Sequence, residues 1–82
     1  PKIWRIVESN KVIEVLQRRN LLKQYRKAKL YLLAGSASKV SFKQRRPKGS
    51  NVWSFRINKQ FRAFATFNSK EELVVFQIYN HQ

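Results

Sequence analysis

The sequence contains no cysteine, no aspartate and no methionine, and it has a single histidine among its 82 residues. The absence of cysteine excludes a disulfide framework, a thiolate zinc site and a thiol nucleophile. With one histidine and no aspartate, we expect no metal site built from protein ligands and no cofactor. A serine hydrolase triad is disfavoured as well, because Ser50 and Ser54 have no acidic residue nearby and the single histidine does not complete a persuasive triad.

Acidic residues and long apolar runs are also scarce. Four acidic side chains stand against 18 lysines and arginines, which gives a formal net charge of +14. This balance indicates a polyanionic partner. No apolar run is long enough for a membrane helix. Residues 1–5 (PKIWR) do not resemble a signal peptide, so we expect a cytoplasmic protein that does not associate with membranes.

The apolar content that is present suffices for one small packed domain. Hydrophobic residues make up 43 % of the chain and aromatic residues 13 %. Disordered basic tails lack an apolar fraction of this size. We therefore predict a single domain over residues 1–82.

The first half of the chain predicts a strand and two helices. Residues 3–7 (IWRIV) are β-branched and aromatic, which is typical of a strand. Ser9 or Asn10 is expected to cap a helix that runs to about Arg19 and carries its apolar residues on one face.

Asn20 is expected to cap the second helix, whose apolar stripe recurs at helical spacing. This helix should end near Ala34, because Gly35 can adopt the left-handed conformation that follows a helix. The link between the two helices is short, so we predict a helical hairpin.

The second half of the chain changes to a period of two. Residues 40–46 predict a strand that ends at Pro47, and residues 48–51 predict a turn. Three further strands, which short turns should join into an antiparallel meander, are predicted at residues 52–58, 61–67 and 73–80. We summarise the expectation as an α+β fold of order β-α-α-β-β-β, in which a helical hairpin packs on a twisted, mainly antiparallel sheet.

Two arginines late in neighbouring predicted strands are candidate anion ligands. If the turn at residues 59–60 pairs their strands, Arg56 and Arg62 lie opposite or diagonal to each other on one face. Paired guanidinium groups form a strong phosphate clamp. Exposed strand arginines that bind nothing are also common, and the pattern alone leaves both interpretations open.

The single histidine is the second candidate, since histidine ordinarily titrates near neutrality. His81 shares strand parity with Val75, Gln77 and Tyr79, so Tyr79 and His81 are expected on one face. Cleavage of a phosphodiester by a ribose hydroxyl needs proton transfer and charge stabilisation. A histidine, a tyrosine and two arginines supply both without a metal. A lone surface histidine can also have no chemical role.

A basic run covers Lys43, Arg45, Arg46 and Lys48 at a predicted strand end and turn. Most such runs are solvated surface. This one leads into the arginine-bearing strands, so we predict that it follows a nucleic-acid backbone. The alternating aromatic residues of the strands are assigned to the core: Trp53, Phe55, Phe61 and Phe67.

Three segments in this order resemble the RelE/ParE toxin superfamily, over essentially the whole chain. They are residues 53–58 (WSFRIN), residues 61–63 (FRA) and the final NHQ of residues 80–82. The sequence is most similar to the RelE-like branch that includes the YoeB toxins. There a Trp-Ser-x-Arg-Ile strand is followed, six residues after its arginine, by a second arginine, as Arg56 is followed by Arg62 here.

The resemblance implies a RelE-like fold and a toxin of a bacterial type II toxin–antitoxin pair, which cleaves mRNA in the ribosomal A site and so inhibits translation. By position, Arg56 and Arg62 match the family's phosphate-binding and transition-state-stabilising arginines, and His81 matches its catalytic histidine. The implied partners are mRNA, ribosomal RNA and an acidic cognate antitoxin. The toxin–antitoxin complex is expected to bind operator DNA through the antitoxin.

The sequence also departs from the family. YoeB-type toxins carry a catalytic glutamate where residues 42–46 (FKQRR) contain no acid, and they end on a tyrosine where Gln82 stands. A lysine of the basic run, which lies where RelE proper has functional lysines, or Tyr79 is therefore the alternative general base alongside His81. The alternative functions are a ParE-like inhibitor of DNA gyrase and a non-catalytic RNA-binding module.

Overall fold

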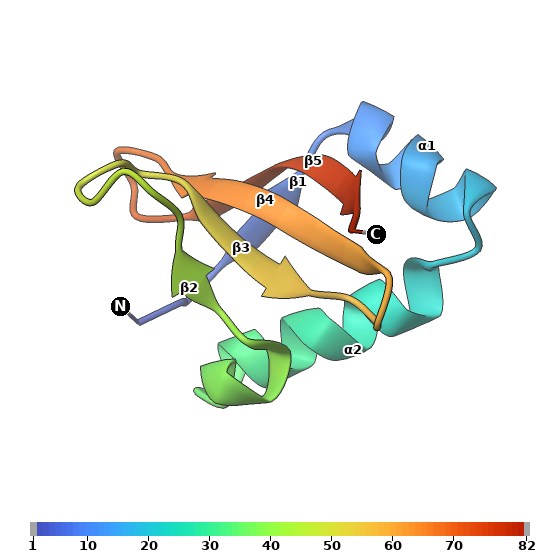
Figure 1. Cartoon of the computed structure of the whole chain (residues 1–82), viewed down its shortest axis with the longest axis horizontal. Coiled ribbons are helices and arrows are strands. Elements are labelled where there is room, and N and C mark those ends of the chain that lie inside the picture. Colours follow the sequence, from blue (N-terminus) through green and yellow to red (C-terminus); the bar gives the residue numbers. More distant parts are fainter. Residues whose placement is uncertain (1, 82) are drawn as a thin grey trace.

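The helical stripes and alternating strands assemble into two layers (Figure 1). The computed structural model describes residues 2–81. Its elements are β1 (Ile6–Glu8), α1 (Asn10–Arg18), α2 (Leu22–Leu33), the 3-10 helix η1 (Ala37–Val40), β2 (Lys43–Gln44), β3 (Trp53–Arg56), β4 (Phe61–Phe67) and β5 (Leu73–Asn80). The α+β class agrees with the prediction. Four strands follow the helices, which matches the number of separately predicted segments, whereas the summary order β-α-α-β-β-β counted three. None of the helices in residues 2–81 combines the length and apolar character needed to cross a membrane.

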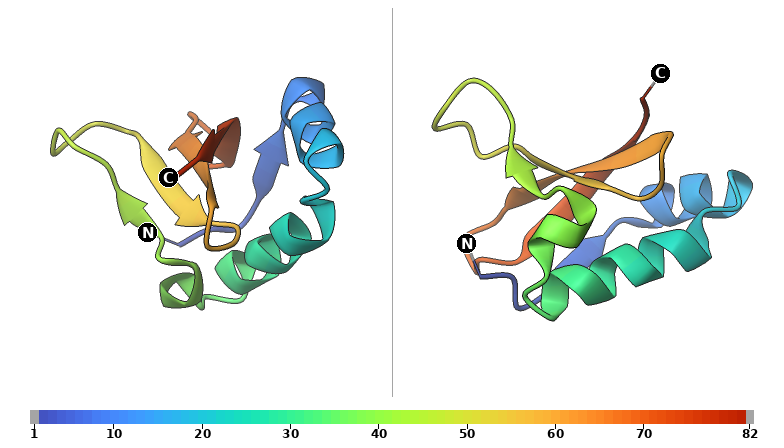
Figure 2. Two further views of the ribbon diagram at one scale, coloured as in Figure 1. Left: turned by 45° about the vertical axis from the view of Figure 1, so that its right-hand side comes forward. Right: turned by 60° about the horizontal axis from the view of Figure 1, so that its bottom comes forward.

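The five strands form one mixed sheet in the order β1-β5-β4-β3-β2. β3, β4 and β5 make the predicted antiparallel meander, and β2 pairs antiparallel with β3. Only β1 runs parallel to its neighbour, β5. In Figure 1, α2 runs beneath the sheet and α1 lies at the upper right, near β1 and β5. Figure 2 shows that the two helices meet at an angle on one side of the sheet, which leaves the opposite face of β3, β4 and β5 uncovered. We call this the open face.

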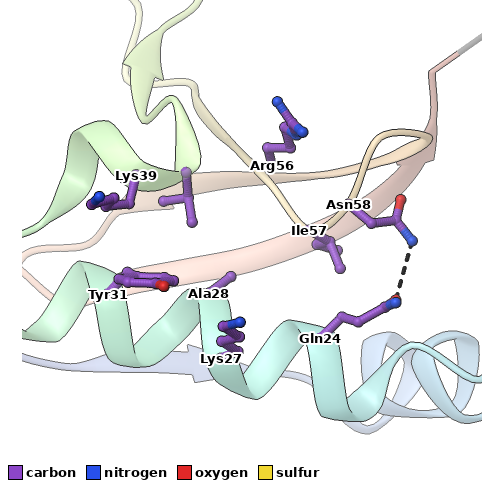
Figure 3. A pocket seen from close by; sticks show the side chains of 9 residues that line it. Gln24, Lys27, Ala28, Tyr31, Lys39, Arg56, Ile57 and Asn58 are labelled. Carbon is purple, nitrogen blue, oxygen red and sulfur yellow. Dashed lines mark hydrogen bonds between the residues drawn. The ribbon is translucent and has the colours of Figure 1, made fainter.

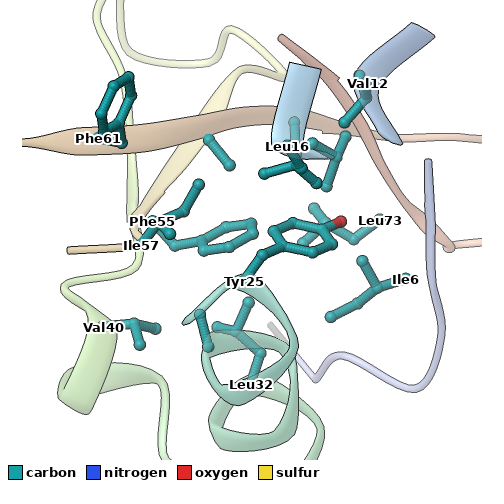
Figure 4. Close-up of a cluster of buried hydrophobic side chains, with 14 of the residues drawn as sticks. Ile6, Val12, Leu16, Tyr25, Leu32, Val40, Phe55, Ile57, Phe61 and Leu73 are labelled. Carbon is teal, nitrogen blue, oxygen red and sulfur yellow. The ribbon is translucent and has the colours of Figure 1, made fainter. Parts of the chain in front are cut away.

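Side chains from both layers form one core, shown in Figure 4. α1 contributes Leu16, and α2 contributes Tyr25 and Leu32 from the predicted stripe. The ring centroid of Tyr25 lies 6.2 Å from that of Phe55 in β3. Ala63 of β4 is fully buried, because it lies on the sheet face that the helices cover.

The link between the helices differs from the prediction. Asn20 has a φ of 60° and so lies in the left-handed region. Its N–H donates to the carbonyl of Gln17 at 3.0 Å, and the Leu21 N–H donates to the carbonyl of Leu16 at 2.7 Å. This pair of bonds is the Schellman arrangement that closes a helix. The prediction that Asn20 caps α2 is therefore wrong, whereas Gly35 ends α2 in the same arrangement, as predicted.

The segment before Pro47 also differs from the prediction. The strand predicted at residues 40–46 is η1 followed by the two-residue strand β2. Ser41 separates them with a φ of 52°, a left-handed conformation that a strand does not accept. Val40 and Phe42 alternate in the sequence, but a turn lies between them.

A β-bulge in β5 decides which of its side chains face the helices. Phe64 pairs with Gln77, but the next residue, Ala65, pairs with Val75, so Phe76 is an extra residue in β5. Val75 is buried in the core, whereas Gln77 is exposed on the open face. The predicted shared parity of the last strand is therefore wrong at Val75, because the bulge reverses the alternation there.

Candidate functional site

One row of side chains crosses three strands of the open face. Arg56 of β3 pairs in register with Arg62 of β4, and Arg62 pairs with Tyr79 of β5. Opposed residues of neighbouring strands have Cβ atoms about 4.5–5.5 Å apart. Arg56 and Tyr79 are exposed and Arg62 is half-buried. The predicted opposition of the two arginines is confirmed, and we call these three residues the arginine row.

His81 lies at the end of the arginine row. Its ring centroid is 6.1 Å from that of Tyr79, and its side chain is exposed. The His81 N–H donates to the carbonyl of Gln60 at 2.6 Å. Gln60 belongs to the turn between β3 and β4, so this bond holds the end of the last strand beside the arginine pair. Tyr79 and His81 lie side by side, as predicted, and Tyr79 is on the open face because of the bulge in β5.

Asn58 shapes the turn that sets the arginine register. Its Oδ1 accepts hydrogen bonds from the N–H groups of Gln60 and Phe61, both at 2.8 Å. Asparagine side chains that bond to the backbone just ahead of them stabilise turns in this way. The turn stabilised by the Asn58 side chain thus sets the register that places Arg56 opposite Arg62.

Phe64 is a residue of this face to which the sequence interpretation gave no role. Its ring centroid lies 5.5 Å from that of Tyr79, and the guanidinium carbon of Arg45 lies 5.8 Å from the Phe64 centroid. Phe64 follows Arg62 by two residues, and this shared strand parity was the available signal. The rings of Phe64, Tyr79 and His81 form an aromatic cluster beside the arginine row. The Arg45 guanidinium covers the Phe64 end of this cluster.

The predicted basic run is divided by the fold. Lys43 pairs with Ser54, which lies two residues before Arg56 in β3, and Arg45 covers Phe64. Arg46 and Lys48 are exposed in the loop before β3, which projects from the end of the sheet opposite the Gln60 turn (Figure 1). Two members of the run therefore flank the open face, and two do not reach the arginine row.

All four acidic side chains lie away from the arginine row. Glu8 is in β1, Glu14 is in α1, and Glu71 and Glu72 are in the turn between β4 and β5. Like charges directly opposed across a strand pair destabilise the pair. An anion held between Arg56 and Arg62 relieves this repulsion, which makes the row suited to bind a phosphate group. Among residues 2–81, no three histidine, aspartate or glutamate side chains gather into a metal-binding group.

A second titratable cluster is structural. The Tyr25 hydroxyl donates to Glu8 Oε2 at 2.6 Å, and Lys29 Nζ donates to Glu8 Oε1 at 3.2 Å. Burial raises the pKa of Tyr25 well above its ordinary value, and the hydrogen bond to Glu8 and the charge of that carboxylate raise it further. These contacts join α2 to β1 on the covered side of the sheet, so this cluster takes no part in the open face.

The functional groups available on the open face are guanidinium, imidazole and phenol groups of its own side chains. Two guanidinium groups can bind an anion, and an imidazole and a phenol beside them can transfer protons. Three neighbouring rings offer flat surfaces for stacking. No protein-family model matches the chain, and no curated protein matches it.

Proposed function

We propose that the protein is a toxin of a bacterial type II toxin–antitoxin pair, an endoribonuclease that needs no metal and cleaves mRNA in the ribosomal A site. The observation that carries the proposal is the opposition of Arg56 and Arg62 beside Tyr79 and His81. An anion relieves the arginine repulsion. A phosphodiester is the anion that also accounts for the proton-transfer groups next to it.

In the proposed reaction, the ribose 2′-oxygen attacks the adjacent phosphorus. The O2′–P bond forms and the P–O5′ bond breaks, which leaves a 2′,3′-cyclic phosphate and a 5′-hydroxyl. The 2′-hydroxyl loses one proton and the 5′-oxygen gains one, so no co-reactant is consumed. Arg56 and Arg62 hold the non-bridging oxygens and stabilise the charge that develops on the phosphorane. His81 and Tyr79 share the two proton transfers.

The aromatic cluster supports a single-stranded substrate. Unstacked bases bind on aromatic side chains in many single-stranded RNA sites. Phe64 lies on the same face as the arginine row, in contact range of both Tyr79 and the Arg45 guanidinium. A base next to the scissile phosphate would stack on the aromatic cluster. This requires an unpaired base, as in the single-stranded mRNA of a ribosome.

The positive net charge of the protein supports the proposed partners, which are all negatively charged. A net charge of +14 suits a protein that works against ribosomal RNA in the cytoplasm. An acidic antitoxin would cover the exposed cations when the toxin is idle, and it would fold as it binds. The complex would bind operator DNA through the antitoxin. A small acidic protein encoded in the neighbouring reading frame, if one is found there, would support this part of the proposal.

The test is cleavage of mRNA on purified programmed ribosomes, with the RNA ends mapped. The wild-type protein is expected to cut in the A site. Arg62→Gln should slow the cut about 10²–10³-fold, because it removes a contact to the developing charge. His81→Ala should slow it about 10²–10⁴-fold. Lys70→Gln removes one positive charge from the turn between β4 and β5 and should leave the rate unchanged.

Unfolding curves separate loss of chemistry from loss of fold. Arg62→Gln should be at least as stable as the wild type, because it removes the repulsion with Arg56. Intact mRNA with the wild-type protein, or equal cleavage by the wild type and both site variants, would contradict the proposal. Inhibition of gyrase supercoiling that survives Arg62→Gln and His81→Ala would favour a ParE-like function instead.

A further inference from the structure

Three cationic side chains line a cleft next to the arginine row. The cleft lies between α2, η1 and the end of β3 and has a volume of about 330 Å³. Lys27 lines it from α2, Lys39 from η1 and Arg56 from β3. Figure 3 shows Tyr31 and Lys39 at one end of the cleft and the Gln24–Asn58 hydrogen bond at the other.

The cleft exists because β3 becomes a free edge before it ends. β2 pairs with β3 only at Trp53 and Ser54, so beyond Ser54 this edge faces η1 and α2 and not another strand. Asn58 Nδ2 donates to Gln24 Oε1 at 3.1 Å, which joins the turn after β3 to α2. The walls of the cleft are therefore held by secondary structure and by this bridge.

The charge of the cleft is not neutralised by the protein. No acidic residue is found among the lining residues that the structure describes. Within residues 2–81, the two ion pairs use Arg5 and Lys29, neither of which lines the cleft. Lys27, Lys39 and Arg56 are all exposed and so can reach a ligand.

We propose that this cleft binds the RNA backbone at phosphates next to the one held by the arginine row, an inference that rests on the proposed function. Arg56 belongs to both features, since it pairs with Arg62 and also lines the cleft. A single strand can therefore run from Arg62 across the free edge of β3 to Lys39 and Lys27. Tyr31 offers a ring for a base on this path, which favours RNA over an acidic peptide.

The experiment measures binding of a short single-stranded RNA at several salt concentrations, with every protein carrying His81→Ala so that cleavage does not interfere. Lys27→Gln together with Lys39→Gln should weaken binding about tenfold and lower the slope of log affinity against log salt by about 1.4, or about 0.7 for each lost phosphate contact. Lys2→Gln with Lys70→Gln removes the same charge from exposed positions outside the cleft and should change the slope far less.

Three results would overturn the cleft as an RNA site. They are equal losses in the two double variants, no loss in either, or retained RNA binding together with lost binding of a polyglutamate peptide. Thermal unfolding of both double variants establishes that they are folded. Ribosomal cleavage is a separate measurement: intact mRNA with the wild-type protein contradicts the proposed function, while the cleft is judged on binding alone.

Discussion

Arg56 and Arg62 are paired at a position where two like charges reduce the stability of the β3–β4 hairpin. No acidic side chain relieves them, because all four lie in β1, in α1 or in the turn between β4 and β5. An anion held between the two side chains would relieve this repulsion. The repulsion in the free protein and the phosphate binding proposed for this pair would therefore have the same electrostatic origin.

The buried Tyr25 hydroxyl should make the stability of the protein depend on pH, and substitution of Tyr25 tests this. Its pKa is raised in the folded protein, so its contribution to stability is complete below its unfolded pKa of about 10 and is lost as the pH rises above that value. Above about pH 10, the wild type should lose up to about 1.4 kcal/mol more stability per pH unit than Tyr25→Phe. Urea unfolding across this range measures the difference.

At neutral pH, where Tyr25 is protonated, the wild type should be the more stable of the two proteins. Tyr25→Phe should be about 1–3 kcal/mol less stable than the wild type, because Glu8 loses one of its two hydrogen-bond donors and keeps only Lys29. Lysines titrate in the same alkaline range, but they are common to both proteins, so their effect cancels in the comparison. Parallel stability curves for the two proteins above about pH 10 would contradict this account.

Among the elements, β5 has the largest effect on the site. Its bulge adds one residue between the pairs Ala65–Val75 and Phe64–Gln77. Before the bulge, β5 contributes Val75 to the core; after it, β5 contributes Tyr79 to the open face. If Phe76 instead took a regular strand position, the uninterrupted alternation would point Tyr79 to the same side as Val75, toward the helices.

Deletion of Phe76 tests this role. Phe76 is about half exposed and is the extra residue, so its removal leaves all other pairs of β4 and β5 in place. The shortened protein should keep Tyr79 beside Arg62 and lose less than about 1 kcal/mol, a fall in Tm of less than about 8 °C. Circular dichroism melting and ribosomal cleavage measure both consequences.

Deletion of Ile78 is the matched control. Ile78 pairs with Ala63 on the covered side, so its removal forces either Tyr79 into the core or Gln77 opposite Ala63. This change should cost at least about 2 kcal/mol, as burial of an unpaired polar group does. Equal destabilisation by the two deletions would show that Phe76 is not a dispensable bulge residue.

In the molecule as a whole, the net charge of +14 is unevenly distributed. Glu8 and Glu72 form ion pairs with Lys29 and Arg5, which compensates charge away from the arginine row. The open face and the neighbouring cleft carry cations without acidic partners among the residues that line them. The free protein is therefore destabilised by repulsion that a polyanion or added salt would reduce.

Added salt should consequently stabilise the free protein. Between low salt and about 0.5 M sodium chloride, Tm should rise by about 4–8 °C, which corresponds to about 1 kcal/mol for a domain of this size. A Lys2→Glu and Lys70→Glu variant lowers the net charge outside the site and should show a smaller rise. A Tm that stays constant or falls as salt increases would contradict the role of self-repulsion.

Much of the fold follows from local patterns in the sequence. The apolar stripe of α2 predicts its buried side, Gly35 predicts its end, and alternation predicts β4 and β5 with their observed bounds. The Asn20 prediction failed because asparagine suits both the start of a helix and the left-handed residue that follows one. The strand predicted before Pro47 failed because two alternating apolar residues do not distinguish a strand from a turn.

The sequence by itself determined the chemistry available to this protein: no thiol, one imidazole, few carboxylates and an excess of guanidinium and ammonium groups. It also determined the opposition of Arg56 and Arg62, because a short turn sets the register of neighbouring strands locally. Only the tertiary structure decided that Arg45 covers Phe64 on this face, that Arg46 and Lys48 do not reach the arginine row, and that a cleft opens beside Arg56. These features depend on a bulge and on where β2 stops pairing, which result from packing between segments far apart in the chain.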